Sequence, residues 1–210
     1  MEFIDASVDR YLREVLPPRE EVLTDIEAVA AKEGIPIVGP VVGRLLKQLA
    51  HMVDARRVFE MGSAVGYSAI WWARAVGPDG KVFYSDGSSE KAERARHYLK
   101  KAGLADRVEV LIGNSLDLID QTEGDFDIIF NDVDKHYYPE VYRRSVERVR
   151  VGGLLVADNV LWGGAVADPD VRDPDTDGIR EFNRLIYHDS RYLTTILPVR
   201  DGVLVARRMK

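Results

Sequence analysis

Short apolar runs alternate along most of the chain with longer segments in which apolar residues recur every three or four positions. The short runs are rich in β-branched and aromatic residues and predict strands, whereas the longer spacing predicts helices between them. The strands are expected at 58–61, 81–86, 107–112, 126–131 and 153–158. The helices are expected at 69–73, 89–101, 138–150 and 176–188. This alternation predicts a parallel sheet with helices on both faces.

The two ends of the chain depart from that alternation. Before the first strand, helical spacing predicts a cover of three helices, at 7–16, 18–33 and 40–52. After the last helix come two more strands, at 193–199 and 203–208. They are joined across Asp201-Gly202, a dipeptide typical of hairpin turns, so the last pair of strands is expected to be antiparallel.

The length and composition favour one domain. A chain of 210 residues with 46% hydrophobic content can bury a full core. No linker rich in Pro, Ser or Gly divides the chain. We therefore expect a single domain over residues 1–210, with a helical cover at 1–52 and a sheet core at 53–210.

Charge and cysteine content narrow the classes of function. The formal net charge of −6 argues against binding to nucleic acid or to an anionic membrane surface. No apolar run approaches the roughly 20 residues of a membrane span, and the acidic N-terminal segment is unlike a signal peptide, so a cytoplasmic location is expected. The chain has no cysteine, and its four histidines are widely spaced. Candidate chemistry therefore rests on carboxylates, amides, hydroxyls and lysine.

The loop after the first strand is a candidate ligand site. Gly62 and Gly66 lie four residues apart and lead into a helix, whose first N–H groups are free to bind a ligand. Asp86 ends the second strand, where nucleotide-binding α/β folds place an acid that binds ribose. The same glycines could serve only to turn the chain. The loop has neither the Gly-x-Gly-x-x-Gly spacing of dinucleotide folds nor a P-loop Gly-Lys-Ser/Thr, which disfavours nicotinamide or phosphate-transfer chemistry.

Oxygen ligands follow two successive strands. Asp132 and Asp134 come after one strand, and Asp158 with Asn159 end the next. Because these strands are expected to be parallel neighbours, their ends meet at the sheet edge that carries the glycine loop. Two carboxylates and an amide suit Mg²⁺, with Mn²⁺ or Ca²⁺ as alternatives. The plainer alternative is an Asx turn at Asp158 and a solvated Asp134–Lys135 pair.

Three motifs together resemble one enzyme family. They are Phe59-Glu60-Met61-Gly62-x-x-x-Gly66-Tyr67-Ser68, Asp132-x-x-Lys135 and Asp158-Asn159-Val160-Leu161-Trp162-Gly163-Gly164. In this order they are similar to the cation-dependent O-methyltransferases, which include catechol O-methyltransferase and the caffeoyl-CoA O-methyltransferases. The resemblance runs from about Pro36 to the terminal hairpin. It implies an α/β, Rossmann-like class I fold that depends on S-adenosylmethionine (SAM), with seven strands ordered 3-2-1-4-5-7-6, strand 7 antiparallel and helices on both faces.

The resemblance also implies roles for individual residues. Binding of SAM would fall to Ile37, Val38, Glu60, Gly62, Gly66, Ser68, Asp86, Asn114, Ser115, Asp132 and Asp134. Among these, Asp86 would hold the ribose and Asp134 would face the methionyl ammonium. The metal ligands would be Asp132, Asp158 and Asn159, and Lys135 would be the general base. Trp162 would wall the acceptor pocket, although a place in a dimer or helix interface is an equal alternative.

The implied reaction is cation-dependent O-methylation of a vicinal dihydroxy aromatic acceptor, catechol-like or caffeoyl-like, by a homodimer. Two positions depart from the family pattern: the stretch 87–89 after Asp86, which reads Gly-Ser-Ser, and Asn114, where an acid is common. No residue matches the glutamate with which catechol O-methyltransferase holds a catechol hydroxyl. Two alternatives remain open, a nicotinamide-dependent reductase and a non-catalytic protein that binds SAM.

Overall fold

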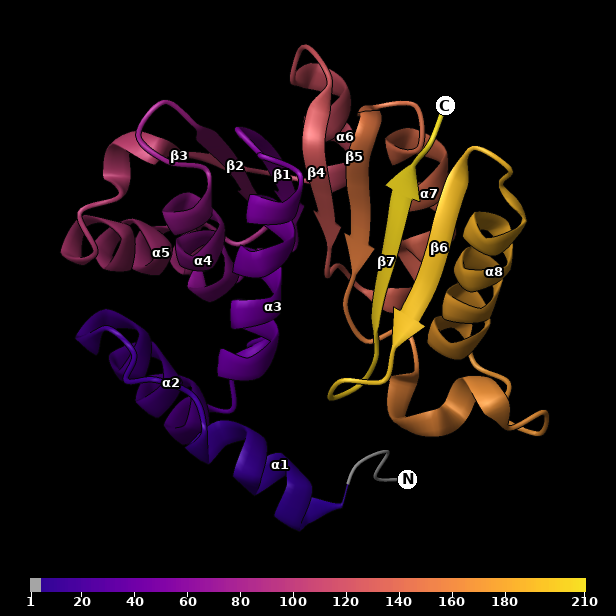
Figure 1. Cartoon of the computed structure of the whole chain (residues 1–210), viewed down its shortest axis with the longest axis horizontal. Coiled ribbons are helices and arrows are strands. Elements are labelled where there is room, and N and C mark those ends of the chain that lie inside the picture. Colours follow the sequence, from indigo (N-terminus) through magenta and orange to yellow (C-terminus); the bar gives the residue numbers. More distant parts are fainter. Residues whose placement is uncertain (1–4) are drawn as a thin grey trace.

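The seven strands form one sheet in the order β3-β2-β1-β4-β5-β7-β6, as seen in the computed structural model, which describes residues 5–210 (Figure 1). The strands are β1 Arg57–Met61, β2 Lys81–Asp86, β3 Val108–Ile112, β4 Phe126–Asn131, β5 Val149–Ala157, β6 Tyr192–Leu197 and β7 Val203–Arg208. Strand β7 runs antiparallel to β5 and β6, and the other neighbours are parallel. The predicted strand order and the antiparallel tail are confirmed.

Helices lie on both faces of the sheet (Figure 1). They are α1 Ala6–Glu14, α2 Glu21–Glu33, α3 Gly39–Met52, α4 Tyr67–Ala75, α5 Ser89–Lys101, α6 Ser115–Gln121, α7 Tyr138–Ser145 and α8 Pro174–His188. Buried residues of α2 to α5 share one core cluster, and those of α6 to α8 share the other. Neighbouring residues of β1 point to opposite faces, so Val58 enters the first cluster and Phe59 the second.

The expected helix at 138–150 is too long. Helix α7 ends at Ser145, and β5 begins at Val149 instead of Gly153. The apolar pair Val146 and Val149 fits helical spacing, but Val149 is buried as the partner of Phe126 in β4. A register shift in β4 follows that pair, and Gly152 takes φ +82° before regular pairing resumes at Leu154.

The N-terminal cover also differs in detail. Helix α2 begins at Glu21 instead of 18. Its N-cap is Glu20, so Pro18 and Arg19 lie before the helix. The Arg19 side chain binds the Glu27 carboxylate. Its Nε lies 2.9 Å from Oε1 and 3.2 Å from Oε2, and its Nη2 lies 3.0 Å from Oε2. Residues 1–4 of the expected cover lie outside the described residues. Over residues 5–210, every helix is too short or too polar to span a membrane.

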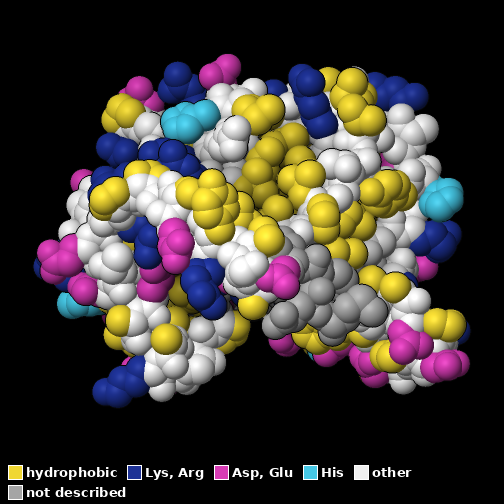
Figure 2. Space-filling view, turned by 60° about the horizontal axis from the view of Figure 1, so that its bottom comes forward, with side chains coloured by type: hydrophobic (Ala, Val, Ile, Leu, Met, Phe, Trp, Pro, Cys, Tyr) yellow, Lys and Arg dark blue, Asp and Glu magenta, His cyan; other side chains and the backbone are white. Residues whose placement is uncertain are grey.

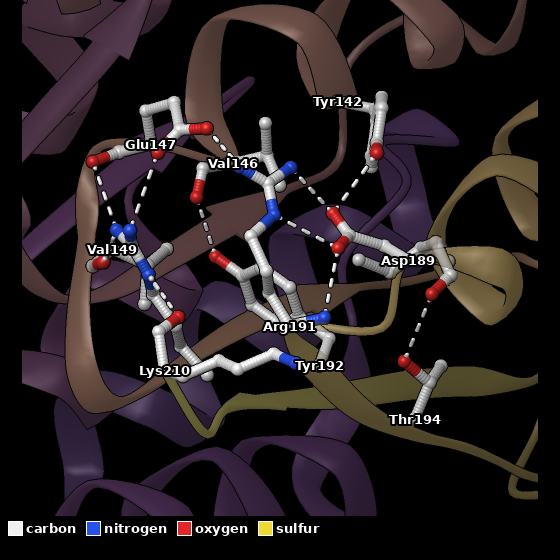
Figure 3. Close-up of polar contacts among 11 residues, drawn as sticks. Tyr142, Val146, Glu147, Val149, Asp189, Arg191, Tyr192, Thr194 and Lys210 are labelled. Carbon is white, nitrogen blue, oxygen red and sulfur yellow. Dashed lines mark hydrogen bonds and ion pairs between the residues drawn. The ribbon is translucent and has the colours of Figure 1, made fainter.

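A cluster of polar contacts holds the turn between α8 and β6 (Figure 3). Arg191 donates to Asp189 Oδ1 from its backbone N at 3.0 Å and from Nε at 2.9 Å, and to Oδ2 from Nη2 at 2.7 Å. The Tyr142 hydroxyl of α7 donates to Asp189 Oδ2 at 3.0 Å. Arg191 also pairs with Glu147, which accepts from Arg208 of β7. The cluster therefore joins α7, the α8–β6 turn and the end of β7.

Replacement of Asp189 by Asn should destabilise the fold above acidic pH. Hydrogen bonds from Arg191 lower the pKa of Asp189 to about 2. A depressed pKa in the folded state gives stability that is present above about pH 4 and is lost as the pH falls toward 2. We expect Asp189→Asn to lower the free energy of unfolding by about 2 kcal/mol at pH 7, measured by urea denaturation.

The matched control is Asp79→Asn, which removes a carboxylate 84% exposed and 3.9 Å from Arg56. That change should stay within about 0.5 kcal/mol of the parent. The difference between Asp189→Asn and the parent should shrink below about pH 3. An equal difference at pH 7 and pH 2.5 would show that the charge of Asp189 is not what stabilises the turn.

Candidate functional site

The carboxyl ends of the parallel strands open into one cavity of about 680 Å³. Residues from the loops after β1, β2, β3, β4 and β5 line it, together with the 36–37 segment before α3. The predicted site residues in its wall are Ile37, Gly62, Asp86, Asn114, Ser115, Asp132, Asp134, Lys135, Asp158, Asn159 and Trp162. The fold therefore brings these residues to one place, as the strand order requires.

Four of the predicted residues lie behind the cavity wall. Val38 is 2% exposed and packs in the core, so Ile37 alone of that pair faces the cavity. Glu60 is fully buried in β1. Gly66 and Ser68 belong to the start of α4, where Gly66 takes φ +83° at the N-cap position. Gly66 and Ser68 would contribute to a ligand site by holding the loop in place.

The glycine loop has a reason for Gly62 beyond turning the chain. Gly62 takes φ +82°, and a Cβ there would lie 2.5 Å from the carbonyl oxygen of Asp132. The N–H groups of Gly62 and Ser63 both donate to the Ser85 carbonyl at 3.0 Å. Gly62 thus lets the loop after β1 contact the backbone after β4 directly.

Asp86 is a fixed acceptor at the other end of the loop. Its Oδ2 accepts from Ala64 N at 2.9 Å, and its Oδ1 accepts from Ser88 N at 2.8 Å. Ser88 in turn caps α5 by accepting from Lys91 N at 3.2 Å. The unusual stretch after Asp86 therefore orients this carboxylate, which keeps lone pairs for hydroxyl donors.

The turn after β3 is the start of α6, a helix of seven residues that the sequence pattern did not predict. Asn114 is its N-cap and accepts from Leu116 N at 2.9 Å. Ser115 is buried and bonds the Ser85 hydroxyl at 2.9 Å. Asn114 thus forms the cap of α6, a role that an acid at this position could also fill.

Glu60 is a buried acid without a normal hydrogen bond. Burial raises its pKa to about 7, and the nearby Ser68 and Ser63 hydroxyls oppose that rise. Neither hydroxyl reaches a carboxyl oxygen of Glu60 with hydrogen-bond geometry, and both oxygens lack a partner among residues 5–210. A buried carboxylate of this kind is stabilised when a cationic ligand group binds nearby.

Asp132 and Lys135 form the central ion pair. Lys135 Nζ lies 2.9 Å from Asp132 Oδ1 and 3.2 Å from the Val133 carbonyl oxygen. Burial raises the pKa of Asp132, and the Lys135 charge opposes the rise. The same ammonium lies 5.3 Å from the ring centroid of Tyr138 and 5.8 Å from that of Trp162. Aromatic faces therefore hold Lys135 at the cavity wall.

Asp158 and Asn159 follow β5 beside that pair. Asp158 is 2% exposed, and its Oδ1 has no partner within the described chain. Burial, followed by the charge of Asp132, raises the pKa of Asp158 to about 7. Asn159 takes φ +59°, and its amide Nδ2 donates weakly to Asp201 Oδ2 at 3.4 Å. This contact leaves the amide oxygen of Asn159 free for a cation.

These donors fit a hard divalent cation. In residues 5–210, no group of three His, Cys, Asp or Glu side chains is arranged to hold a metal ion. The predicted set instead joins two carboxylates, Asp132 and Asp158, to the amide of Asn159. The partnerless Oδ1 of Asp158 and the free amide oxygen are ligands that Mg²⁺ accepts, with water completing the shell.

The cavity also contains residues that the sequence did not single out. They are chiefly Lys91, Leu116, His136, Tyr137 and Arg200. Asp175 Oδ1 accepts from both the backbone N and the ring Nδ1 of His136, each at 3.0 Å. His136 and Tyr137 directly follow Lys135, and Arg200 precedes the hairpin Asp201-Gly202, so their positions in the sequence indicated a place near the site. The position of Lys91 gave no such indication, because only the folded chain brings α5 to this edge.

Comparison with known proteins decides the family. A family model described as O-methyltransferase matches residues 16–209. The chain belongs to this O-methyltransferase family. The catechol O-methyltransferase of Niastella koreensis is 33% identical over 197 residues, which cover 91% of this chain and 89% of that protein. Caffeoyl-CoA O-methyltransferase 1 of Eucalyptus globulus is 33% identical over 223 residues, which cover 98% of this chain and 89% of that protein.

Solved O-methyltransferases share the fold. The crystal structure of TomG from Streptomyces achromogenes, involved in tomaymycin synthesis and in complex with SAM, superposes with a TM-score of 0.89. It is 33% identical and covers 97% of this chain and 96% of its own. The protein is therefore an enzyme of the O-methyltransferase family, as the three motifs predicted. This assignment removes the support for a nicotinamide-dependent reductase.

Proposed function

We propose that this O-methyltransferase transfers the methyl group of SAM to one hydroxyl of a vicinal dihydroxy aromatic acceptor, with the help of a divalent cation. One observation carries the proposal. The Asp132–Lys135 pair, the buried Asp158, whose Oδ1 has no partner among residues 5–210, and Asp86, the acid expected to hold the ribose, line a single cavity. A methyltransferase without a metal has no evident need for the carboxylates of Asp132 and Asp158 at two neighbouring strand ends.

The cofactor would lie along the β1 and β2 ends of the cavity. Asp86, held by two backbone N–H groups, would accept hydrogen bonds from the ribose hydroxyls. Asn114 and Ser115 would flank the adenine, and Ile37 would close over the cofactor. The acids Glu60 and Asp134 would favour the cationic methionyl end. The solved relative in complex with SAM supports SAM as the cofactor.

The acceptor would lie between Lys135, Trp162 and the β5 end. Lys135 would act as the neutral amine, with the cation instead of its own ammonium facing Asp132, and its Nζ would take the proton of the reacting hydroxyl as the oxygen forms its bond to the methyl carbon and the sulfur–carbon bond breaks. Asp132, Asp158 and Asn159 would hold the cation, which favours ionisation of that hydroxyl and fixes two adjacent oxygens. Trp162 packs against the second core cluster and lines the cavity, so it would bound the acceptor ring.

Two measurements test the function. Calorimetry should show SAM binding, and incubation with Mg²⁺, SAM and catechol should give the monomethyl ether and S-adenosylhomocysteine. Phenol, which has one hydroxyl, is the matched control and should react far more slowly. Binding of SAM without turnover of any vicinal diol would contradict the proposed acceptor class.

We also propose that the enzyme is a homodimer. Helix α1 contributes no buried side chain. Val8 and Tyr11 on it are 45% and 61% exposed, and Val15, its C-cap, is 55% exposed. Their spacing of three and four residues places them on one helical face. Leu193 of β6 is 66% exposed. Figure 2 shows hydrophobic side chains gathered on the face of the molecule in that view. A second copy would cover such apolar surface.

Sedimentation tests the dimer. The parent should sediment as a dimer at micromolar concentration, and Tyr11→Asp combined with Val15→Asp should sediment as a monomer. Tyr187→Asp, on α8 and 49% exposed, is the control and should remain a dimer. A monomeric parent would contradict the proposal.

A further inference from the structure

Arg200 occupies a turn position that favours glycine. It lies between β6 and β7 with φ +51°, in the left-handed backbone region that residues other than Gly rarely adopt. The next two residues of this hairpin bond the segment after β5, because Leu161 N donates to the Asp201 carbonyl and Val160 N to that of Gly202. The turn therefore holds Arg200 at the cavity wall in an unfavourable backbone conformation, which points to a role for its side chain.

The guanidinium of Arg200 is only partly used by the protein. Its Nη1 donates to the Ile37 carbonyl at 3.0 Å and lies 3.8 Å from Asp158 Oδ2. Among residues 5–210, no hydrogen bond engages its Nη2 or Nε, and the side chain is 31% exposed. An arginine in a cavity wall with free donors is suited to bind a carboxylate.

Arg200 brings a positive charge to the acceptor end of the cavity. Asp132 is paired with Lys135, whereas Arg200 lies 3.8 Å from Asp158 Oδ2 and makes no closer ion pair among the described residues. Asp134 and Asp175 also line the cavity, and Asp175 accepts from His136. A carboxylate on the acceptor would therefore be recognised by the guanidinium and its free donors directly.

We propose that Arg200 selects acceptors that carry a carboxylate on the dihydroxy aromatic ring. The inference rests on the proposed function, because it places the acceptor beside Asp158 and Lys135. The free edge of the guanidinium would bind the carboxylate while Nη1 keeps its contact with Ile37. The substrate class of this site is thus a dihydroxybenzoate or a similar aromatic acid, in preference to a neutral catechol.

Binding without turnover tests this preference. Calorimetry would compare 3,4-dihydroxybenzoate with its neutral amide, 3,4-dihydroxybenzamide, on protein loaded with S-adenosylhomocysteine and Mg²⁺. The parent should bind the carboxylate at least about tenfold more tightly. Arg200→Gln should bring the two dissociation constants together, and Arg200→Lys should keep part of the preference because the charge remains.

The matched control is Lys91→Gln, which also removes one positive charge from the cavity but at the Ser88 end. It should keep the preference of the parent. The proposal is overturned if the parent binds both compounds equally, or if the preference survives in Arg200→Gln. It is also overturned if Arg200→Gln weakens the binding of both compounds by the same factor, since Arg200 would then only position Ile37 and Asp158.

Further measurements distinguish failure of this inference from failure of the proposed function. Circular dichroism of Arg200→Gln and Arg200→Lys verifies folding, and Arg200→Lys carries the test if Arg200→Gln does not fold. A loss of S-adenosylhomocysteine affinity in Arg200→Gln, with no carboxylate preference in the parent, would assign Arg200 to the cofactor and overturn the inference. Failure of the parent to methylate both catechol and 3,4-dihydroxybenzoate would defeat the proposed function, while the binding preference would still be measurable.

Discussion

Chelation of divalent cations by EDTA should reduce methylation of catechol to background, while SAM binding changes by less than about threefold. The reason is spatial separation. The proposed cation donors Asp132 and Asp158 follow β4 and β5, whereas Asp86, the acid proposed to hold the ribose, follows β2. The donors are oxygens, so added Mg²⁺ or Mn²⁺ should restore activity. Turnover assays and calorimetry in the same buffer measure the two effects.

Asp158→Ala should reproduce the effect of EDTA. It removes a buried carboxyl, a proposed cation ligand, whose Oδ1 has no partner among the described residues. Asp175→Ala is the control, because it removes another carboxylate of the cavity that is not a proposed ligand. Its activity should remain and should stay sensitive to EDTA. Full activity of the parent in EDTA, with no metal in the purified protein, would refute the cation-dependent assignment.

Lys135→Met should lower kcat by about 10²- to 10⁴-fold and leave SAM affinity nearly unchanged. That range is typical of a general base. The Nζ of Lys135 lies beside Asp132 and between two aromatic rings, and we propose that it acts on the acceptor hydroxyl instead of on the cofactor. Single-turnover kinetics with saturating SAM would separate the chemical step from binding.

Lys91→Met is the matched control for Lys135→Met. Lys91 lines the same cavity, beside Ser88 on α5. Its replacement should leave kcat within a few fold of the parent. Because Lys135→Met leaves the buried Asp132 without its ion pair, circular dichroism must first show that the variant is folded. Near-parental kcat in a folded Lys135→Met would mean that Lys135 is not the base.

The sequence predicted the strand ends well because short apolar runs mark buried strands clearly. Asp86, Asp132 and Asp158 each stand at the end of such a run, so a parallel sheet had to bring them to one edge. The predicted boundary between α7 and β5 was wrong because the apolar residues there fitted both helical and strand spacing. Val149 fitted a helical face, but the pairing with Phe126, which is distant in sequence, made it part of a strand.

Contacts between distant segments could not be predicted in the same way. Helix α6 has only seven residues, too few for a clear apolar repeat, and it is recognisable mainly by its Asn114 cap. Arg200 meets Ile37 across 163 positions of sequence. Within residues 5–210 the Glu60 carboxyl has no hydrogen bond, which likewise depends on where the Ser63 and Ser68 hydroxyls point, and the sequence does not specify that.

The contact between Gly62 and the backbone of Asp132 limits how the enzyme could be engineered. Any side chain at Gly62 would press on the Asp132 carbonyl, so a change meant to alter cofactor choice would also disturb the acceptor end. Gly87 is different, because a Cβ there would have no neighbour closer than the Gly113 carbonyl oxygen at 4.0 Å. Libraries that aim to accept synthetic SAM analogues should therefore keep Gly62 fixed and vary Gly87.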